Sequence, residues 1–349
     1  MFDGIKILDL SVSATALLQH ERLTFPLPID ESTGAVLNHV RRSTDNGLTF
    51  CLLPTHADPN QYRVELSGSI HRYGRDGIHN ADDFTLPDLL AALNQLVTTY
   101  PINPFTSRLN NVEFGVNVVL PFPVARVLKN LVSYKNRPFV KDVCSETPYY
   151  QCQTQRYVVK LYDKGHQYRN LDPKPDANLL RVEVKVIKME YLTRQSIHLN
   201  SLDDLLTVSN YGALGALLVQ TFTEILFNDP TISLATLTPK DREVCLNGRN
   251  PLFWSIPDDL TGREYERHRK GLQRLEKRYK MLQYRHSNGA DWQSQTAALI
   301  GQTWERLIRS DNDLLTKINQ HRAAWRTLQN EPENCPKLTG EPEPNNSEE

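Results

Sequence analysis

Four short segments of this chain alternate strictly between apolar and polar residues, a pattern that predicts β-strands with one buried face. Successive side chains along a strand point to opposite faces, so the alternation separates a core side from a polar side. The segments are 62–69 (YRVELSGS), 112–118 (VEFGVNV), 157–163 (YVVKLYD) and 181–186 (RVEVKV). In the last of them the three valines point one way, and Arg181, Glu183 and Lys185 point the other.

If the four strands share one sheet, their polar side chains gather on a single face. These side chains are Glu65, Glu113, Glu183, Lys160, Tyr162, Arg181 and Lys185. For each strand taken alone, a solvated sheet face is the ordinary explanation. Together they suggest a site, because carboxylates such as Glu113 and Glu183 are the hard ligands that Mg²⁺ or Mn²⁺ prefers. Tyr162 is a candidate nucleophile there, since a metal on the scissile phosphate, with Lys160 and Lys164 nearby, would favour attack by its phenolate. The equally good alternative is a tyrosine at a strand end with its hydroxyl in water.

Helical spacing accounts for most of the remaining chain. Within the strand-rich part it predicts helices at 84–100, capped by Asp82 or Asp83, and at 123–134. Further helices are predicted at 202–206, 212–227, 262–283 and 291–328. We therefore predict an α+β fold, an antiparallel sheet with helices packed on one face in ferredoxin-like (RRM-like) halves, followed by a mostly helical C-terminal region. The expected domains are 1–200 and 201–330, with an acidic, disordered tail at 331–349.

Composition excludes several classes of protein. The net charge of -1 gives no overall basic field, so any DNA affinity must come from local patches. The five cysteines are scattered without a CxxC pair, which argues against a disulfide framework or zinc site and fits a reducing cytoplasm. The start (MFDGIKILDL) lacks the features of a signal peptide. The longest apolar stretch, 212–227, is too short and too polar to cross a membrane.

One segment is strongly basic. Between residues 261 and 286 nine Lys and Arg residues stand against three glutamates, while apolar residues recur every three or four positions. This pattern predicts a helix with a core stripe and a basic face at 262–285. A solvated face is the plain explanation, and phosphate binding is the functional one. The candidate DNA contacts are Arg267, Lys270, Arg274, Lys277 and Arg278.

Four motifs occur in an order that resembles a known group of proteins. They are 64–80 (VELSGSIHRYGRDGIHN), 109–118 (LNNVEFGVNV), 157–168 (YVVKLYDKGHQY) and 178–192 (NLLRVEVKVIKMEYL). In this order they resemble the filamentous-phage gene II replication proteins and the Rep-trans plasmid rolling-circle initiators. The resemblance covers roughly residues 60–206. No His-hydrophobic-His triplet occurs in the sequence, so the histidine pair of the HUH endonucleases is missing.

The resemblance implies a metal-dependent, site-specific DNA endonuclease and strand transferase with its catalytic and origin-binding part in 1–200. Such a rolling-circle replication initiator nicks one origin strand and leaves a 5′-phosphotyrosine and a 3′-OH primer. The implied residues are Tyr162 and Lys164 for catalysis, Glu113, Glu183 and His79 for Mg²⁺ or Mn²⁺, and Lys160, Arg181 and Lys185 for DNA. The sequence leaves open whether Tyr149, Tyr150, Tyr157 or Tyr168 attacks instead.

The implied partners are origin DNA, as a duplex or an extruded single-stranded hairpin, and a host helicase and polymerase. A homodimer is left open, and no membrane partner is expected. The alternative function is a DNA-binding replication or regulatory protein of phage or plasmid origin that does not cleave. A third interpretation is an unrelated α+β protein, which predicts that the carboxylates lie far apart.

Overall fold

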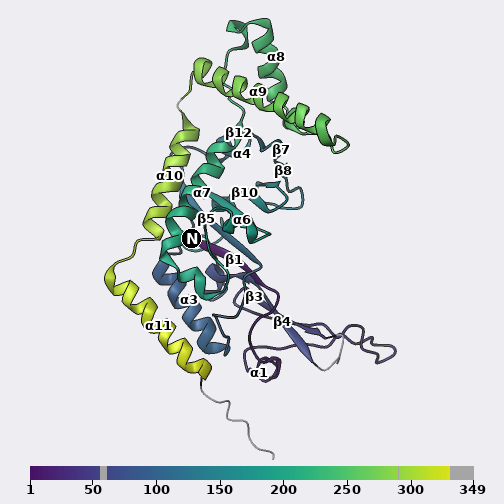
Figure 1. Cartoon of the computed structure of the whole chain (residues 1–349), viewed down its shortest axis with the longest axis vertical. Coiled ribbons are helices and arrows are strands. Elements are labelled where there is room, and N and C mark those ends of the chain that lie inside the picture. The colour runs from purple at the N-terminus through teal and green to yellow at the C-terminus, as the bar shows by residue number, and fades with distance from the viewer. Residues whose placement is uncertain (56–60, 290, 331–349) are drawn as a thin grey trace, which may run out of the picture.

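A nine-stranded antiparallel sheet runs through the centre of the computed structural model, which describes residues 1–55, 61–289 and 291–330 (Figure 1). From one edge to the other the strands are β2 (Arg41–Asp45), β3 (Leu48–Pro54), β4 (Tyr62–Ser69), β1 (Phe2–Ile7), β5 (Asn111–Val119), β11 (Leu179–Val186), β10 (Tyr157–Asp163), β9 (Tyr149–Gln153) and β8 (Val140–Lys141). The prediction of an α+β fold with an antiparallel sheet is confirmed.

All four predicted strands are present and belong to this sheet, as β4, β5, β10 and β11. β11 lies between β5 and β10, with Glu183 opposite Gly115 on one side and opposite Lys160 on the other. Val112, Phe114, Val182 and Val184 are buried on the apolar face. The polar side chains of these strands therefore lie on one surface, as the alternation predicts.

The strand β1, which sequence patterning did not predict, separates β4 from β5. Its pairing with β5 shifts between Phe2 and Ile5, so that both of these side chains are buried although they are three positions apart. Such an irregularity breaks the period of two. As a consequence Asp3 joins the polar face, where its carboxylate accepts a hydrogen bond from the Ser69 hydroxyl of β4.

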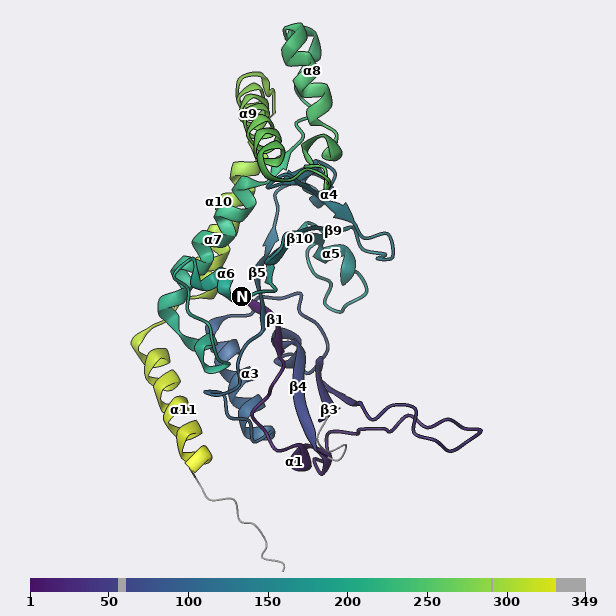
Figure 2. The same ribbon diagram turned by 45° about the vertical axis from the view of Figure 1, so that its right-hand side comes forward.

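Helices α3 (Leu86–Thr99), α7 (Tyr211–Glu224) and α10 (Trp292–Leu307) contribute to the apolar core on one side of the sheet (Figure 2). Trp304 of α10 contacts Phe114 of β5 edge to face and donates its indole N–H to the Tyr211 carbonyl. The helix predicted at 84–100 is capped by Thr85, not by Asp82 or Asp83. Thr85 forms a capping box with Asp88, which satisfies two backbone N–H groups at the start of α3.

Several predicted helices differ in the structure. The segment 123–134 is the short helix α4 (Val124–Leu128) followed by strand β6 (Leu131–Tyr134), and 212–227 ends in strand β12 (Leu226–Phe227). β6 pairs with β12 and with β7 (Arg137–Pro138), so strand partners outweigh the helical spacing of these residues. The segment 291–328 is two helices, α10 and α11 (Asn312–Asn330), and 203–206 is 3-10 helical. The remaining short helices are α1 (Ala14–Leu18), α2 (Ile70–Tyr73), α5 (Lys164–Gln167) and α6 (Glu190–Thr193).

A second, smaller core includes side chains of α8 (Pro239–Gly248) and α9 (Gly262–His286), the helices at the top of Figure 1. It joins Val132 of β6 and Leu226 of β12 to Trp254, Leu272 and Tyr279. The main core, by contrast, contains side chains from both sides of residue 200, including those of α7 and α10. The boundary near residue 200 stays a prediction, and the tail predicted at 331–349 lies outside the described residues.

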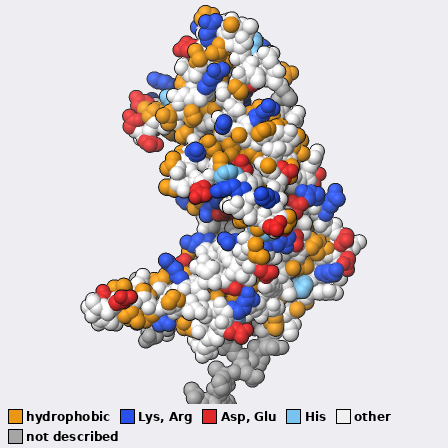
Figure 3. Space-filling view, turned by 180° about the vertical axis from the view of Figure 1, so that it is seen from behind, with side chains coloured by type: hydrophobic (Ala, Val, Ile, Leu, Met, Phe, Trp, Pro, Cys, Tyr) orange, Lys and Arg blue, Asp and Glu red, His pale blue; other side chains and the backbone are white. Residues whose placement is uncertain are grey.

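An extended arm formed by residues 21–40 projects from the body of the molecule (Figure 2 and, from behind, Figure 3). It is closed by an isolated bridge between Ile29 and Val36, both of which are exposed. Across the described part of the chain, no helix is long and apolar enough to cross a membrane.

Candidate active site

A cavity of about 370 Å³ opens on the polar face of the sheet, where β1, β4, β5, β9, β10 and β11 contribute side chains. The charged residues of its lining are Asp3, Lys6, Glu113, Lys160, Glu183 and Lys185. Tyr149 and Tyr162 also line it. The structure thus gathers five of the predicted site residues around one space: Glu113, Lys160, Tyr162, Glu183 and Lys185. The expectation of distant carboxylates is not met.

Lys160 connects the two predicted metal ligands. Its ammonium lies 3.0 Å from Glu113 Oε2 and 3.0 Å from Glu183 Oε1. Lys185, whose side chain is 40% exposed, lies 2.8 Å from the other oxygen of Glu113. Burial alone would lower the pKa of the Lys160 amine, but the charges of Glu183 and Glu113 outweigh it and raise that pKa. Lys160 is therefore held as a cation between the carboxylates.

Arg181 forms the deeper half of the cluster. Its side chain is only 2% exposed, and its Nε donates to Glu183 Oε2 at 2.9 Å. Its Nη2 lies 3.5 Å from Asp3 Oδ2. Burial favours the neutral acid, yet Arg181 and Lys164 lower the pKa of Asp3, while Lys160 and Arg181 lower the pKa of Glu183. Both acids are thus ionised at neutral pH, and Arg181 is committed to them.

Tyr162 and Lys164 lie side by side at the end of β10. The strand ends at Asp163, whose carboxylate caps the short helix α5 by accepting the His166 N–H at 2.8 Å, and this turns Lys164 inward. The Lys164 amine lies 3.5 Å from the Tyr162 hydroxyl, which in turn donates to Glu183 Oε2 at 3.5 Å. Burial and then the Glu183 charge raise the pKa of Tyr162 well above its usual value. Tyr162 is therefore protonated at neutral pH and needs a base to become a nucleophile.

Lys164 has the properties of such a base. It is 1% exposed, and burial lowers the pKa of its amine to about 8 despite the nearby charge of Asp3. Its ammonium donates to Asn80 Oδ1 at 2.7 Å, and Asn80 Nδ2 donates to Asp3 Oδ2 at 2.8 Å. At pH 7 about a tenth of the lysine is thus uncharged, within reach of the phenol.

Asp3 and Asn80 are site residues that the sequence prediction missed. Asn80 is the last residue of the motif at 64–80, in which the resemblance implies a role only for His79. For Asp3 the available signal was its place in the alternating start Phe2–Ile7, which the irregular pairing of β1 obscures. Together they link β1 and the loop before α3 to the Tyr162–Lys164 pair.

Two glycines of this face make room for charged side chains of the protein itself. A Cβ atom at Gly4 would lie 2.7 Å from Glu113 Cδ, and one at Gly115 would lie 2.7 Å from Glu183 Cα. Real Cβ atoms do not approach other atoms so closely. Gly115 therefore serves the close packing of β5 against β11.

The carboxylates do not form a ready metal site. Each oxygen of Glu113 and Glu183 already has a cationic partner among Lys160, Lys185 and Arg181. His79 lines a different cavity, with its Nδ1 3.5 Å from Asp82. Among the described residues no group of three His, Cys, Asp or Glu side chains is placed to hold an ion. The donor set as it stands does not fit the predicted Mg²⁺ or Mn²⁺.

The basic residues predicted to bind DNA on α9 lie far from this cavity in the fold, in the part at the top of Figure 1. Five of the helix's basic residues are exposed at three- and four-residue steps: Arg263, Arg267, Lys270, Arg274 and Lys277. Within the described chain none of the five forms an ion pair. Arg278 differs, because its guanidinium lies 2.8 Å from Asp241 and ties α9 to α8. We call the five exposed residues the basic stripe.

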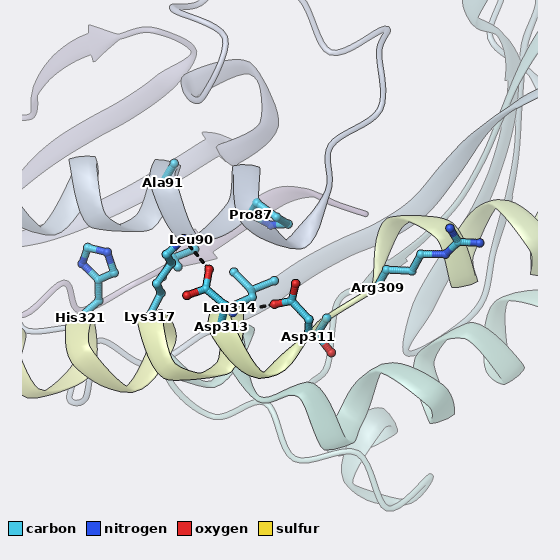
Figure 4. Close-up of a pocket in the computed structure, with 10 residues that line it drawn as sticks. Pro87, Leu90, Ala91, Arg309, Asp311, Asp313, Leu314, Lys317 and His321 are labelled. Carbon is cyan, nitrogen blue, oxygen red and sulfur yellow. Dashed lines mark hydrogen bonds and ion pairs between the residues drawn. The ribbon is translucent and has the colours of Figure 1, made fainter.

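A larger cavity, of about 600 Å³, lies between α3 and α11 (Figure 4). Pro87, Leu90 and Ala91 form its α3 wall, and Asp313, Lys317 and His321 project from α11. Lys317 and Asp313 form an exposed pair one helical turn apart, at 2.7 Å. Such pairs are common on helix surfaces, so this cavity lacks the buried, converging charges of the polar face.

In structural terms this is an α+β protein. It has a buried charge cluster and a tyrosine–lysine pair on the polar face of its sheet. No protein-family model matches the sequence, and no curated protein matches it. Among solved structures the chain is similar to the rolling circle replication initiator protein from Geobacillus stearothermophilus, with 10% identity and a TM-score of 0.33. The likeness covers 79% of this chain and 96% of that one. A likeness this distant assigns neither a family nor a function.

Proposed function

We propose that this protein is a rolling-circle replication initiator that nicks one origin strand through Tyr162. The observation that carries the proposal is the convergence of the Tyr162 hydroxyl, the Lys164 amine and Glu183 beside one cavity. A phenol that lies 3.5 Å from an amine of lowered pKa is a nucleophile beside a potential base. The product is a 5′-phosphotyrosine and a free 3′-OH that primes synthesis.

In the first step the neutral amine of Lys164 takes the proton of the Tyr162 hydroxyl. The phenolate oxygen attacks the scissile phosphorus, the bond from phosphorus to the 3′-oxygen breaks, and that oxygen takes a proton from the Lys164 ammonium. Glu183, fixed by Arg181 and Lys160, orients the phenol through its hydrogen bond. Arg181 and Lys160 were predicted as DNA contacts, but their burial and pairing favour this supporting role.

The more exposed basic residues are the candidates for binding phosphate. Lys185 reaches the rim of the cavity and is 40% exposed, so it can meet a phosphate without leaving its pair with Glu113. The basic stripe offers a second surface for duplex DNA. The host helicase, the host polymerase and a homodimer remain predictions.

A DNA-binding protein that does not cleave is the second candidate function. The burial of the Tyr162 hydroxyl and the full pairing of the carboxylates favour it, because a binder needs only the basic stripe. The two candidates differ in whether covalent attachment to DNA occurs.

The test is incubation of the full chain with a supercoiled plasmid carrying the DNA that flanks its gene, with Mg²⁺ or Mn²⁺ added. We expect a nicked circle with protein covalently attached, and no attachment by Tyr162→Phe. Tyr284→Phe is the matched control, since Tyr284 is 90% exposed on α9. Attachment that survives Tyr162→Phe would remove Tyr162 from its role, and binding without attachment by the wild type would favour the second candidate. A parallel reaction in EDTA tests the predicted ion.

The basic stripe yields a separate prediction about DNA affinity. The double variant Lys270→Ala/Arg274→Ala should weaken binding to a duplex and reduce the slope of log K against log salt by about two, because each lost phosphate contact removes about 0.9 from the slope. Fluorescence anisotropy with a labelled duplex at several salt concentrations measures this slope.

The matched control is Arg269→Ala/Lys280→Ala, which removes the same two charge types from the same helix. Arg269 and Lys280 pair with Glu266 and Glu276 at 2.7 and 2.8 Å, so they have less to offer phosphates. Equal losses in the two double variants would mean that α9 acts through net charge alone.

A further inference from the structure

One lysine of the cavity on the polar face has no charged partner. Lys6 of β1 lines this cavity and is half-buried. Among residues 1–55, 61–289 and 291–330, no side chain or carbonyl forms an ion pair or hydrogen bond with its ammonium. Lys160, Lys185 and Arg181, by contrast, each contact a carboxylate of this face. Lys6 therefore brings a positive charge to the cavity that the described residues do not balance.

The carboxylates on the strands around Lys6 already have cationic partners. Each oxygen of Glu113, on the neighbouring strand β5, faces a lysine on β10 or β11. Asp3, on the same strand as Lys6, is held by the buried guanidinium of β11. Glu65 of β4, on the other side, pairs with Arg63 at 3.0 Å. The charge of Lys6 thus stays available to an anion that comes from a ligand.

A hydroxyl without a partner lies next to this lysine. In the antiparallel pairing of β1 with β4, Ser67 stands directly opposite Lys6, and both line the cavity. Opposite side chains in such a pair have Cβ atoms about 5 Å apart. In the part of the chain that the structure describes, the Ser67 hydroxyl makes no hydrogen bond. An ammonium and a hydroxyl, both able to donate, therefore face one space, and such donors bind phosphate oxygens.

Lys6 lies far along the polar face from Tyr162. β1 and β10 are separated by β5 and β11, which amounts to about 14 Å at the usual spacing between strands. The registers also place Tyr162 in line with Asn117 of β5, whereas Lys6 is opposite Asn111, about 20 Å away along that strand. A DNA strand whose scissile phosphate lies at Tyr162 can therefore reach Lys6 only with a phosphate several nucleotides away.

We propose that Lys6, together with Ser67, binds a phosphodiester of the nicked strand several nucleotides from the cleavage site. This inference rests on the proposed function. The strand then crosses the polar face from β10 towards β1 and β4, and passes the exposed ammonium of Lys185 on β11. A phosphate contact at this distance does not touch the reacting atoms, and it fixes the register of the strand in the cavity.

The experiment measures binding of a single-stranded oligonucleotide that carries the nick site mapped in the plasmid assay. The protein is the full chain with Tyr162→Phe, so that no covalent bond is expected. In a series of oligonucleotides, one phosphodiester at a time is replaced by an uncharged methylphosphonate, and each is titrated by fluorescence anisotropy. The variants added to this background are Lys6→Ala and Lys6→Gln, which remove the charge, and Lys6→Arg, which keeps it. Lys188→Ala is the matched control, because Lys188 is an exposed lysine that follows β11 and does not line the cavity.

We expect one linkage, several nucleotides from the nick, at which the methylphosphonate weakens binding by about fivefold when Lys6 is present and by less than about twofold in Lys6→Ala and Lys6→Gln. With the unmodified oligonucleotide, the two neutral variants should also lower the slope of log K against log salt by about 0.7, the value for one phosphate contact to a single strand. Lys6→Arg should keep both the sensitive linkage and the slope. Lys188→Ala should change neither.

The inference is overturned if both neutral variants lose affinity equally at all linkages, or if no linkage distinguishes them from the protein with Lys6. A sensitive linkage that adjoins the nick, or the same effect in Lys188→Ala, also overturns it. These results leave the proposed function standing, because that function is tested by covalent attachment of the wild type in the plasmid assay. If the wild type attaches to no DNA there, the proposed function fails, and this inference with it.

Discussion

Glu183→Gln is expected to destabilise the protein by about 3–5 kcal/mol, because it removes one partner from a buried ion pair and leaves charge uncompensated. Glu183 is 3% exposed and faces Arg181 and Lys160, whose side chains are 2% and 13% exposed. The glutamine cannot balance either cation. Urea unfolding followed by tryptophan fluorescence measures the loss.

Glu113→Gln is the matched control, since both glutamates contact Lys160 at 3.0 Å. Glu113 is 14% exposed and the side chain of its second partner, Lys185, is 40% exposed, so we expect a loss of only about 1 kcal/mol. Equal losses in the two variants would contradict the assignment of Glu183 as the centre of the cluster. Both measurements are made in EDTA, because a glutamate that acts mainly as an ion's ligand would show its effect only when the ion is added.

The effect of Glu183→Gln also has a defined pH dependence. The cations around Glu183 lower the pKa of its carboxyl below the 4.5 of the unfolded chain, so its contribution is fully present above pH 4.5. As the pH falls below that value, the wild type loses this contribution by protonation. The difference between wild type and variant should therefore shrink in acid.

Alternation alone was enough to predict the polar face. Residues such as Arg181, Glu183 and Lys185 are separated from three buried valines by the pleat of the strand, a property of local geometry. The prediction that these strands share a sheet is confirmed by the register of β5, β11 and β10. The residues that share the polar face can therefore be predicted from the two-residue alternation of the strands.

The alternation does not predict how deeply each charged side chain is buried or which residue it pairs with. Nothing in the order of residues indicates that Lys160 sits between two carboxylates, or that Lys164 is 1% exposed. Asp3 was missed because β1 pairs irregularly. β6 was missed although β7 is a near neighbour, because its other strand partner, β12, lies nearly a hundred residues away. Such facts depend on contacts between distant segments, which sequence spacing does not record.

Lys164→Met is expected to raise stability while abolishing cleavage. Burial lowers the pKa of the Lys164 amine to about 8, against 10.5 in the unfolded chain, so below pH 8 the folded protein bears the cost of a buried ammonium. At about 1.4 kcal/mol for each unit, removing that cost should add on the order of 2–3 kcal/mol at pH 7. Asn80 keeps its bond from Tyr168, so the methionine leaves it a partner. Cleavage should fall by about 100-fold or more, because Tyr162 loses its base.

The pH dependence of stability and of the cleavage rate also tests the role of the Lys164 amine. Between pH 8 and 10.5 the unfolded chain holds the Lys164 proton more strongly than the folded chain, so the stability advantage of Lys164→Met should decline as the pH rises through this window. The cleavage rate of the wild type should rise with pH up to about 8 and then level off. Lys141→Met, at an exposed lysine of β8, is the control and should change neither quantity. A Lys164→Met protein that is less stable at pH 7, or a wild-type rate independent of pH between 6 and 8, would show that Lys164 is a charged structural residue and that Tyr162 has no neutral base beside it.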